Sequence, residues 1–276
     1  MTYGPNPWHQ TNWDWRAAAN FMGGGAGAGL IAFAALFGAP AWVSLAGAAL
    51  VGLGLLAVWF EIGRPLRAIN VLKNPNTSWM TREAMVAPFV FAAAAAPWFG
   101  VPLGAAGAVP ALAYLYCQGR ILNAARGIPA WREPLVVPLV IATGLAEGGG
   151  LWLLFGASAG AAPLAPWLGF ALALIARLAL WPAWRRRLAS APRALVAIDA
   201  AGRWFKAATL LPLAAALVAA MAPPPSGAAL LALQGAAGAL AFAGGLWFKF
   251  TLVTRGAYNQ GFAIVHLPVR GVRRSR

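Results

Sequence analysis

Two glutamates stand at the edge of, or inside, long apolar runs, where a carboxylic acid can hold or release a proton. Glu61 ends one run and lies one helical turn before Arg64, so an ion pair at a helix end is available to it. An acid at such a border can also give a proton to a reduced ligand. Glu147 lies about 18 Å along its own run, at a depth where a charge is costly. A hydrogen-bonded tie between helices is the alternative role for Glu147.

Amide, phenol and guanidinium groups near the run ends could bind a ligand that carries carbonyl oxygens. Asn20 lies in the first turns of a run, where its amide can donate either to such a ligand or to a neighbouring helix. Tyr116, Arg120 and Asn123 follow at spacings of four and three, which places them on one helix face. This face could line a polar slot, although an arginine snorkelling beneath an interfacial tyrosine explains the same spacing.

The cysteine and histidine content limits the redox centres that the chain can hold. The single cysteine, Cys117, excludes an internal disulfide, a four-cysteine iron-sulfur cluster and a cysteine-ligated zinc site. His9 and His266 lie in polar end segments, so they are not placed to hold a haem between helices. We therefore expect no haem, no iron-sulfur cluster and no metal site in this chain.

Long apolar helices must position these residues. The 276 residues are 61% hydrophobic and only 10% charged, whereas soluble domains are roughly 25% charged. A membrane span needs about 20 apolar residues, and eight runs meet or approach that length. They cover residues 17–37, 41–62, 84–99, 102–119, 135–156, 165–181, 207–221 and 227–248. The sequence thus predicts an all-α polytopic membrane protein with eight transmembrane helices.

Basic residues occupy alternate connections between these runs. Of the 21 lysines and arginines, only Arg177 lies within a predicted span, and the C-terminal basic set begins at Lys249. By the positive-inside rule, the basic connections and both termini are cytoplasmic, in a multi-pass protein of the cytoplasmic (inner) membrane. The net charge of +15 does not indicate nucleic acid, because the basic residues fall between apolar runs that face membrane lipid. The connections without basic residues lie near Pro40, Gly100, Ala161 and Pro224.

The segment 74–83 leads into the third run. Thr81 is the predicted N-cap of that helix, and Glu83 is favourable in its first turn. Capping does not explain why Trp79 and Arg82 occur together. We expect both to contact a protein partner.

The predicted cytoplasmic connections 63–82 and 183–206 are long, whereas the outer connections are tight turns. A partner-docking surface that also includes Arg67 explains this difference; amphipathic segments lying on anionic lipid are the alternative. The expected organisation is a cytoplasmic N-terminal segment at 1–16, a first four-helix bundle at 17–133, a second four-helix bundle at 134–250 and a basic cytoplasmic tail at 251–276.

Four motifs lie in the first half of the chain. They are Asn-Trp-Asp-Trp-Arg-Ala-Ala-Ala-Asn-Phe at 12–21 with a glycine run after it, Gly-Arg-Pro-Leu-Arg-Ala at 63–68, Ser-Trp-Met-Thr-Arg-Glu at 78–83 and Gly-Ile-Pro-Ala-Trp at 127–131. Together they resemble the NrfD-like family, the membrane-anchor subunits of dimethyl sulfoxide and polysulfide reductases. Within that family the chain is most similar to the membrane subunits of phenylacetyl-CoA:acceptor oxidoreductases. In the second half, only helix number and topology agree.

The resemblance implies a haem-free subunit that binds quinone in its first bundle. It also implies an iron-sulfur electron-transfer partner, which connects to a molybdenum or tungsten pterin catalytic subunit. We expect the quinone, ubiquinone or menaquinone, in a slot near the cytoplasmic helix ends. The slot would contain Asn20, Arg64, Tyr116 and Arg120 as binding residues, with Glu61 as the proton-handling acid. Dimethyl sulfoxide reductase anchors carry a histidine just before the same turn.

Two other functions stay open on the sequence. A secondary transporter would place a substrate site near the membrane midplane, around Glu147 and the three glycines that follow it. A structural anchor would hold soluble partners without any quinone chemistry. Because most polar residues gather at one end, we favour the membrane subunit of a quinone-dependent oxidoreductase complex, which is not catalytic alone. Glu147 would then offer a proton path from the other side.

Overall fold

The structure, a computed structural model, describes residues 4, 6–62, 65–101, 104–156, 160, 162–221 and 227–261, without the side chains of residues 65–67. Its α-helices are α1 (Trp15–Ala19), α2 (Gly25–Phe37), α3 (Ala41–Glu61), α4 (Trp79–Ala95), α5 (Ala108–Ala124), α6 (Pro129–Arg132), α7 (Val136–Gly156), α8 (Leu164–Arg187), α9 (Pro192–Met221) and α10 (Ala228–Phe250). The π segments are η1 (Asn20–Gly24) and η5 (Thr251–Arg255), and the 3-10 segments are η2 (Pro65–Lys73), η3 (Ala96–Phe99) and η4 (Gly104–Gly107).

The all-helical architecture predicted from the sequence is confirmed for the described part of the chain, which has no β-strand. Six helical segments there are long and apolar enough to cross a membrane. They are Trp15–Phe37, Ala41–Glu61, Val136–Gly156, Leu164–Arg187, Pro192–Met221 and Ala228–Arg255. Helices α4 and α5 have 17 residues each, which is about 26 Å at 1.5 Å per residue. The count of eight spans stays a prediction.

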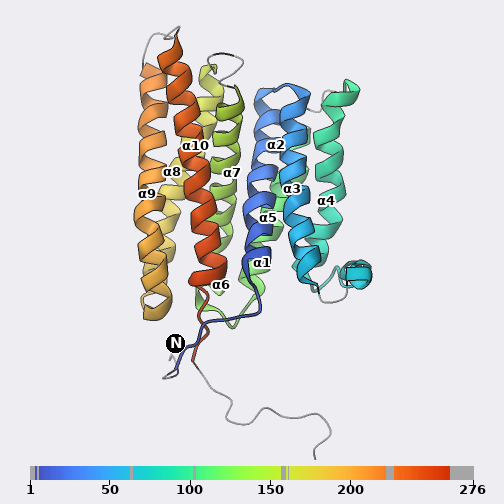
Figure 1. The fold of residues 1–276 in the computed structure, drawn as a ribbon, viewed down its shortest axis with the longest axis vertical. Helices are drawn as coiled ribbons and strands as arrows, with labels where there is room; N and C mark the ends of the chain where they lie inside the picture. The colour runs from blue at the N-terminus through green and yellow to red at the C-terminus, as the bar shows by residue number, and fades with distance from the viewer. Residues whose placement is uncertain are drawn as a thin grey trace, which may run out of the picture.

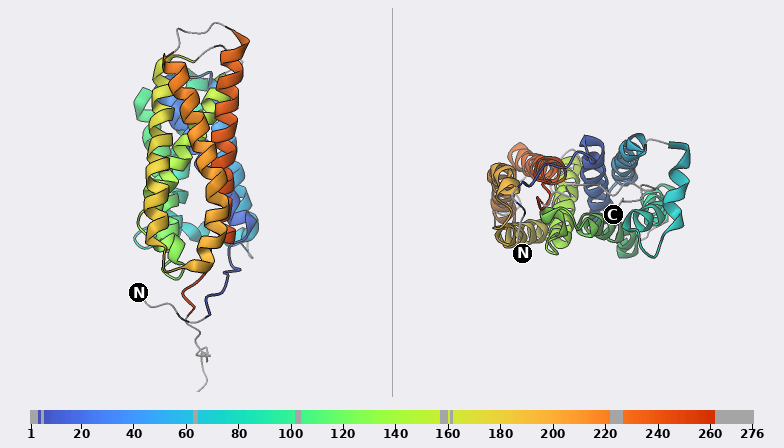
Figure 2. Two further views of the ribbon diagram at one scale, coloured as in Figure 1. Left: turned by 90° about the vertical axis from the view of Figure 1, so that its left-hand side faces the viewer. Right: turned by 90° about the horizontal axis from the view of Figure 1, so that it is seen from below.

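The long helices run side by side, with α2 to α5 on one side of the molecule and α7 to α10 on the other (Figure 1). Seen along the helices, the same two groups of helices lie next to each other (Figure 2). Helix α2 of one group packs against α7 of the other. One apolar core also joins residues of α1, α5 and α7 to residues of α8, α9 and α10. The division into two four-helix bundles therefore stays a prediction, because no described boundary separates two cores.

Glycines allow α2 and α7 to approach backbone to backbone. A Cβ atom on Gly29 would lie 2.0 Å from the carbonyl oxygen of Gly144, and one on Gly148 would lie 2.0 Å from the carbonyl carbon of Gly29. Neither backbone can give way without moving its whole helix. Such contacts between small residues are how membrane helices associate closely.

The segments at the two ends of the described chain lie together. Gln10 N donates to Ala257 O at 2.9 Å, and Asn259 N donates to Trp8 O at 3.0 Å. Both segments emerge at the end of the molecule where α1 and α6 lie, the lower end in Figure 1. We call this the α1 end. Its assignment to the cytoplasm stays a prediction.

Two caps fix the helix starts at the α1 end. Asp14 accepts a hydrogen bond from Arg16 N at 2.7 Å at the start of α1, and the Arg16 guanidinium lowers the pKa of this carboxyl. Ser78 caps α4 by accepting from Thr81 N at 3.2 Å. The prediction of Thr81 as the N-cap is wrong by three positions. Its hydroxyl instead donates to Val71 O and ties η2 to α4.

Candidate functional site

Four polar side chains that are almost fully buried form a cluster at the α1 end. We call it the Asn20 cluster, and it comprises Asn20, Glu83, Tyr114 and Gln118. Asn20 Nδ2 donates to the two carboxyl oxygens of Glu83 at 3.2 and 3.4 Å. Tyr114 OH donates to Asn20 Oδ1 at 3.4 Å, and Gln118 Nε2 donates to Asn20 O at 2.9 Å. One asparagine therefore joins residues from α4 and α5.

Local helix geometry makes room for this cluster. Asn20 begins the π segment η1, and single π turns within helices are frequent at functional sites. Gly24 closes the same segment, and a Cβ atom there would lie 2.6 Å from Gln118 Nε2 and 3.0 Å from Tyr114 OH. Tyr114 and Gln118 are four residues apart, so they share one face of α5. A larger residue at Gly24 would displace both side chains.

A small pocket opens beside the cluster and brings two of the predicted residues together. It is lined by Asn20, Glu61 and Glu83, with an apolar wall formed by Trp13, Ala17, Phe21, Val58, Met80 and Ile121. Its volume is about 30 Å³, which is room for about one water molecule or a carbonyl group. Two carboxylic acids and an amide thus meet around one water-sized space.

The other predicted binding residues lie elsewhere. Tyr116 is 41% exposed, and Arg120 Nη1 donates to its hydroxyl at 3.4 Å. The Arg120 and Arg82 guanidinium carbons lie 4.6 and 4.0 Å from the centre of the Trp79 ring. These four residues form an aromatic and basic surface on α4 and α5. Tyr116 and Arg120 do not line the pocket at Glu61, because the helix face of Tyr114 and Gln118, not theirs, points inward.

The predicted docking residues are only partly described. Arg64 lies outside the described residues, and of Arg67 only the backbone is described, within η2. Arg82 donates from Nε to Pro75 O at 2.8 Å and from Nη2 to Asn76 O at 2.9 Å. Arg82 therefore holds the connection before α4 in shape while its guanidinium stacks on Trp79.

Charged residues form a second buried cluster, between α7, α8 and α10. We call it the Glu147 cluster, and it comprises Glu147, Arg177 and Lys249, each at most 1% exposed. Lys249 Nζ donates to Glu147 Oε2 at 2.5 Å. Arg177 instead donates to Thr209 Oγ1 at 2.9 Å and to Ala208 O at 2.6 Å. The placement of Lys249 among the cytoplasmic charges is wrong, because the helix α10 continues past the apolar run and turns this side chain inward.

The sequence reasoning missed Glu83, Tyr114, Gln118 and Lys249. The prediction of Glu83 in the first turn of α4 is wrong, because the helix begins at Trp79 and its first turn contains no acidic residue. A signal was available for Tyr114 and Gln118, because they repeat at the same spacing of four as Tyr116 and Arg120. No feature of the sequence says which of these two faces of α5 turns toward Asn20.

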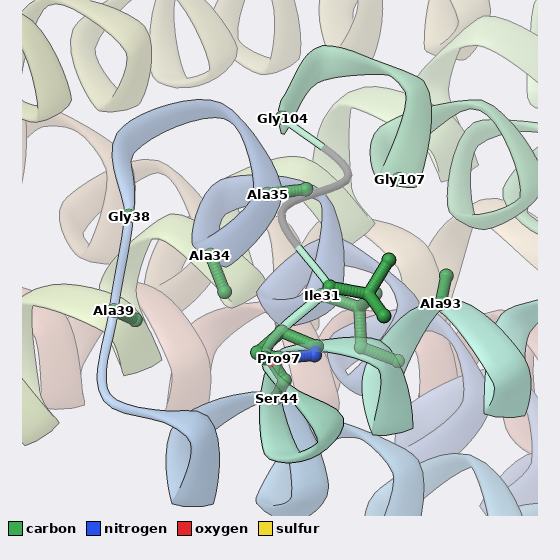
Figure 3. A pocket seen from close by; sticks show the side chains of 12 residues that line it. Ile31, Ala34, Ala35, Gly38, Ala39, Ser44, Ala93, Pro97, Gly104 and Gly107 are labelled. Atoms are coloured by element: carbon green, nitrogen blue, oxygen red, sulfur yellow. The ribbon is translucent and has the colours of Figure 1, made fainter.

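A larger cavity lies at the opposite end of the same helices, beside the C-terminal end of α2, and Figure 3 shows its lining residues. Its volume is about 370 Å³, and its walls include Ile31, Ala93 and Pro97, with Ser44 as the one hydroxyl among them. It offers a carbonyl ligand a single hydroxyl and no acid. The chemistry of the described chain is therefore concentrated at the α1 end and in the Glu147 cluster.

Part of the chain matches known proteins. Residues 41–112, which contain Glu61 and Glu83, match the family described as DMSO reductase anchor subunit (DmsC). The chain is also similar to a sulfite dehydrogenase subunit of Allochromatium vinosum, with 33% identity over 116 residues. That alignment covers 34% of this chain and 36% of the length of the relative. The two matches support a relationship between this chain and the membrane-anchor subunits of oxidoreductases.

Proposed function

We propose that this chain is the membrane-anchor subunit of an NrfD-like oxidoreductase complex and passes electrons between an iron-sulfur partner and membrane quinone. The observation that supports this most directly is the water-sized pocket at the α1 end, where Asn20, Glu61 and Glu83 meet. Both acids lie in the segment that matches the DMSO reductase anchor family. An amide and two acids are the groups that a ligand taking up protons at carbonyl oxygens requires.

The side chains at the pocket fit the polar edge of a quinone. Asn20 supplies an amide, and Trp13, Val58 and Met80 supply an apolar wall. The volume of about 30 Å³ accepts a carbonyl group but not a ring. Met80, which is 42% exposed, must move aside to admit the ring. Ubiquinone and menaquinone satisfy these requirements equally.

The residues of this chain then bind the quinone and supply the protons that it takes up. A bound quinone supplies the capacity to accept two electrons and two protons. Asn20 orients the carbonyl edge, and its own orientation is set by Glu83, Tyr114 and Gln118. Glu61 is the more exposed acid and exchanges protons with the aqueous phase at the α1 end. Because electrons and protons arrive from the same side, the reaction moves no net charge across the membrane.

Membranes that contain the whole complex test this proposal. Glu83→Gln and Asn20→Leu should each lower the rate of quinone reduction roughly 100-fold, which is the lower end of the range expected for the loss of a general acid. Oxidation by the soluble subunits, measured with an artificial dye, should be unchanged. Glu61→Gln should act in the same direction. Ser44→Ala is the matched control, because Ser44 is also buried but lies at the far end of the helices. If all three variants reduce quinone with unaltered kinetics, the quinone does not bind at this pocket.

We further propose that the segment 63–82 contacts the iron-sulfur partner through Arg64, Arg67, Trp79 and Arg82. Arginines there can form bidentate hydrogen bonds with carboxylates of a docked protein. The double variant Arg64→Ala with Arg67→Ala tests this contact most directly. Arg82 is left unchanged because it also holds the connection before α4 in shape. It should release the soluble subunits at moderate salt, whereas Arg126→Ala, exposed at the same end, should retain them. Retention in both variants would place the docking surface elsewhere.

The substrate of the complex is bound by its catalytic subunit, which we propose to carry a molybdenum or tungsten pterin. The motif resemblance favours phenylacetyl-CoA as that substrate, whereas the similar protein of A. vinosum belongs to a sulfite dehydrogenase. Membranes should reduce quinone on addition of phenylacetyl-CoA. A response to sulfite alone would assign the complex to the second chemistry.

The Glu147 cluster favours a second candidate function, ion transport. Three charged side chains are buried together between α7, α8 and α10, where a transporter would bind an ion. However, α7 and α8 run unbroken through Glu147 and Arg177, whereas transporter sites are typically built on broken helices. Ion flux through proteoliposomes that contain this chain alone would support transport. A complex with catalytically active partners and no extractable quinone would instead indicate a structural anchor.

A further inference from the structure

Helices α4 and α5 leave an apolar groove between them. Its volume is about 660 Å³. Phe89 on α4 and Val109 on α5 are 67% and 64% exposed, so the groove opens toward the outside of the molecule. We call it the α4–α5 groove, and its walls include Val86, Phe89 and Ala93 from α4 and Val109, Pro110 and Ala113 from α5.

The length of the groove matches one leaflet of a bilayer. Its wall on α4 and η3 runs from Val86 to Ala96, which is about 15 Å at 1.5 Å per residue. The hydrocarbon core of a membrane is about 30 Å thick, so each leaflet contributes about 15 Å. Arg82 lies one helical turn before Val86, and the α1 end of the groove therefore reaches the level of the lipid headgroups.

A hydroxyl and a guanidinium group lie at this end of the groove. Tyr116 follows Ala113 by three residues on α5, and Arg120 follows Tyr116 by four, so all three share one helix face. Arg120 Nη1 donates to Tyr116 OH at 3.4 Å, which leaves the phenol proton free to be donated. The Trp79 ring holds both side chains in place, because it meets the Tyr116 ring edge to face at 5.5 Å and lies 4.6 Å from the Arg120 guanidinium carbon.

The α1 end of the groove carries positive charge that no acid of the described chain neutralises. The ion pairs among the described residues join other side chains and include neither Arg82 nor Arg120. Arg82 bonds instead to two carbonyl oxygens of its own connection, and Arg120 donates only to Tyr116. A phosphate group would supply the missing negative charge, and the guanidinium group is well suited to bind it.

We propose that the α4–α5 groove binds one acyl chain of an anionic phospholipid, and that Arg120 and Tyr116 bind its phosphate beside Trp79. A single molecule then satisfies both features, because its chain fills the apolar groove and its charge lies at the basic end. A zwitterionic headgroup would bring its own positive charge toward the two arginines and is disfavoured. The site is separate from the pocket at Glu61 and requires neither quinone nor a partner.

The experiment titrates the purified full-length chain, in detergent and freed of native lipid, with phospholipids and counts the bound molecules by native mass spectrometry. Phosphatidylglycerol should bind more tightly than phosphatidylcholine with the same acyl chains. Arg120→Gln should lower the affinity for phosphatidylglycerol about fivefold, the effect of one arginine on an anionic lipid. Arg255→Gln is the matched control, because Arg255 also stacks on a tryptophan, Trp247, but lies outside the groove.

A second variant tests the acyl chain. Ala113→Phe fills the groove and should weaken the binding of long-chain phosphatidylglycerol, whereas Leu172→Phe, at an exposed position of α8, should not. Inorganic phosphate should not displace the bound lipid.

Three results would overturn the site. They are equal affinities of the unaltered chain for the two phospholipids, displacement of the lipid by inorganic phosphate, and unchanged phosphatidylglycerol binding in both Arg120→Gln and Ala113→Phe. A dimer of the unaltered chain that Ala113→Phe dissociates would assign the groove to a second copy of this chain instead. Because quinone and partners are absent, these outcomes are independent of the quinone and docking assays.

Discussion

The ion pair of Lys249 with Glu147 lies in the interior of the described chain, where the loss of one partner is costly. Both side chains are at most 1% exposed, so each charge has lost its water and depends on the other. Removing both charges from such a pair is often neutral, whereas removing one leaves an uncompensated buried charge.

We therefore predict that Glu147→Gln or Lys249→Met alone destabilises the protein by about 3–5 kcal/mol. The double variant should recover most of this loss. Thermal unfolding of the purified chain in detergent measures both effects. A double variant that loses as much as the two single variants together would show that the pair does not act as a unit.

At the scale of helices, glycine contacts decide how α2 sits on α7. The Cβ atom of an alanine at position 29 would come within 2.0 Å of the Gly144 carbonyl oxygen. The first long helix also carries Asn20, Gly24 and Gly25, which lie against the two polar clusters. Any shift of this helix thus changes the packing of α7 and the geometry of both clusters together.

Gly29→Ala should accordingly separate α2 from α7 and greatly reduce the amount of folded protein in membranes. Gly52→Ala in α3 is the matched control, since its added Cβ would meet only the Phe91 ring, at 3.9 Å. Alanine favours a helix over glycine by about 1 kcal/mol, so the control should be as stable as the original chain or slightly more so. Fluorescence-detected size-exclusion chromatography compares the two, and equal yields would argue against close backbone packing.

For the whole molecule, the end segments of the described chain meet at the α1 end, together with the Asn20 cluster and the pocket at Glu61. A chain with both ends on one side crosses the membrane an even number of times. The basic residues in the connections at this end predict that it faces the cytoplasm.

We predict that alkaline phosphatase fused after Arg276 is inactive in cells, because this reporter folds only outside the cytoplasm. The same reporter inserted next to Gly100, in a connection without basic residues, should be active. Activity in the first fusion and not in the second would reverse the orientation. It would also place the pocket at Glu61 on the outer side.

The sequence by itself determined the class of protein and the end of the molecule that carries the pocket. Long apolar runs and basic residues in alternate connections predict membrane helices and their direction, because transfer into lipid depends on composition along the chain. Asn20 and Glu61 could be assigned to the same end for this reason, and the structure places both at one pocket. The predicted number of spans depends on α4 and α5, whose 17 residues make them borderline.

Only the tertiary structure decided which helix faces turn toward one another. A helix surrounded by lipid and by other helices is apolar on nearly every side, so its hydropathy does not fix its rotation. Rotation of α5 puts Tyr114 and Gln118 in the interior and leaves Tyr116 and Arg120 on the surface. The same kind of choice buries Glu83 against Asn20 and Lys249 against Glu147. These pairings depend on the lateral order of the helices, which is set by glycine contacts between residues far apart in the sequence.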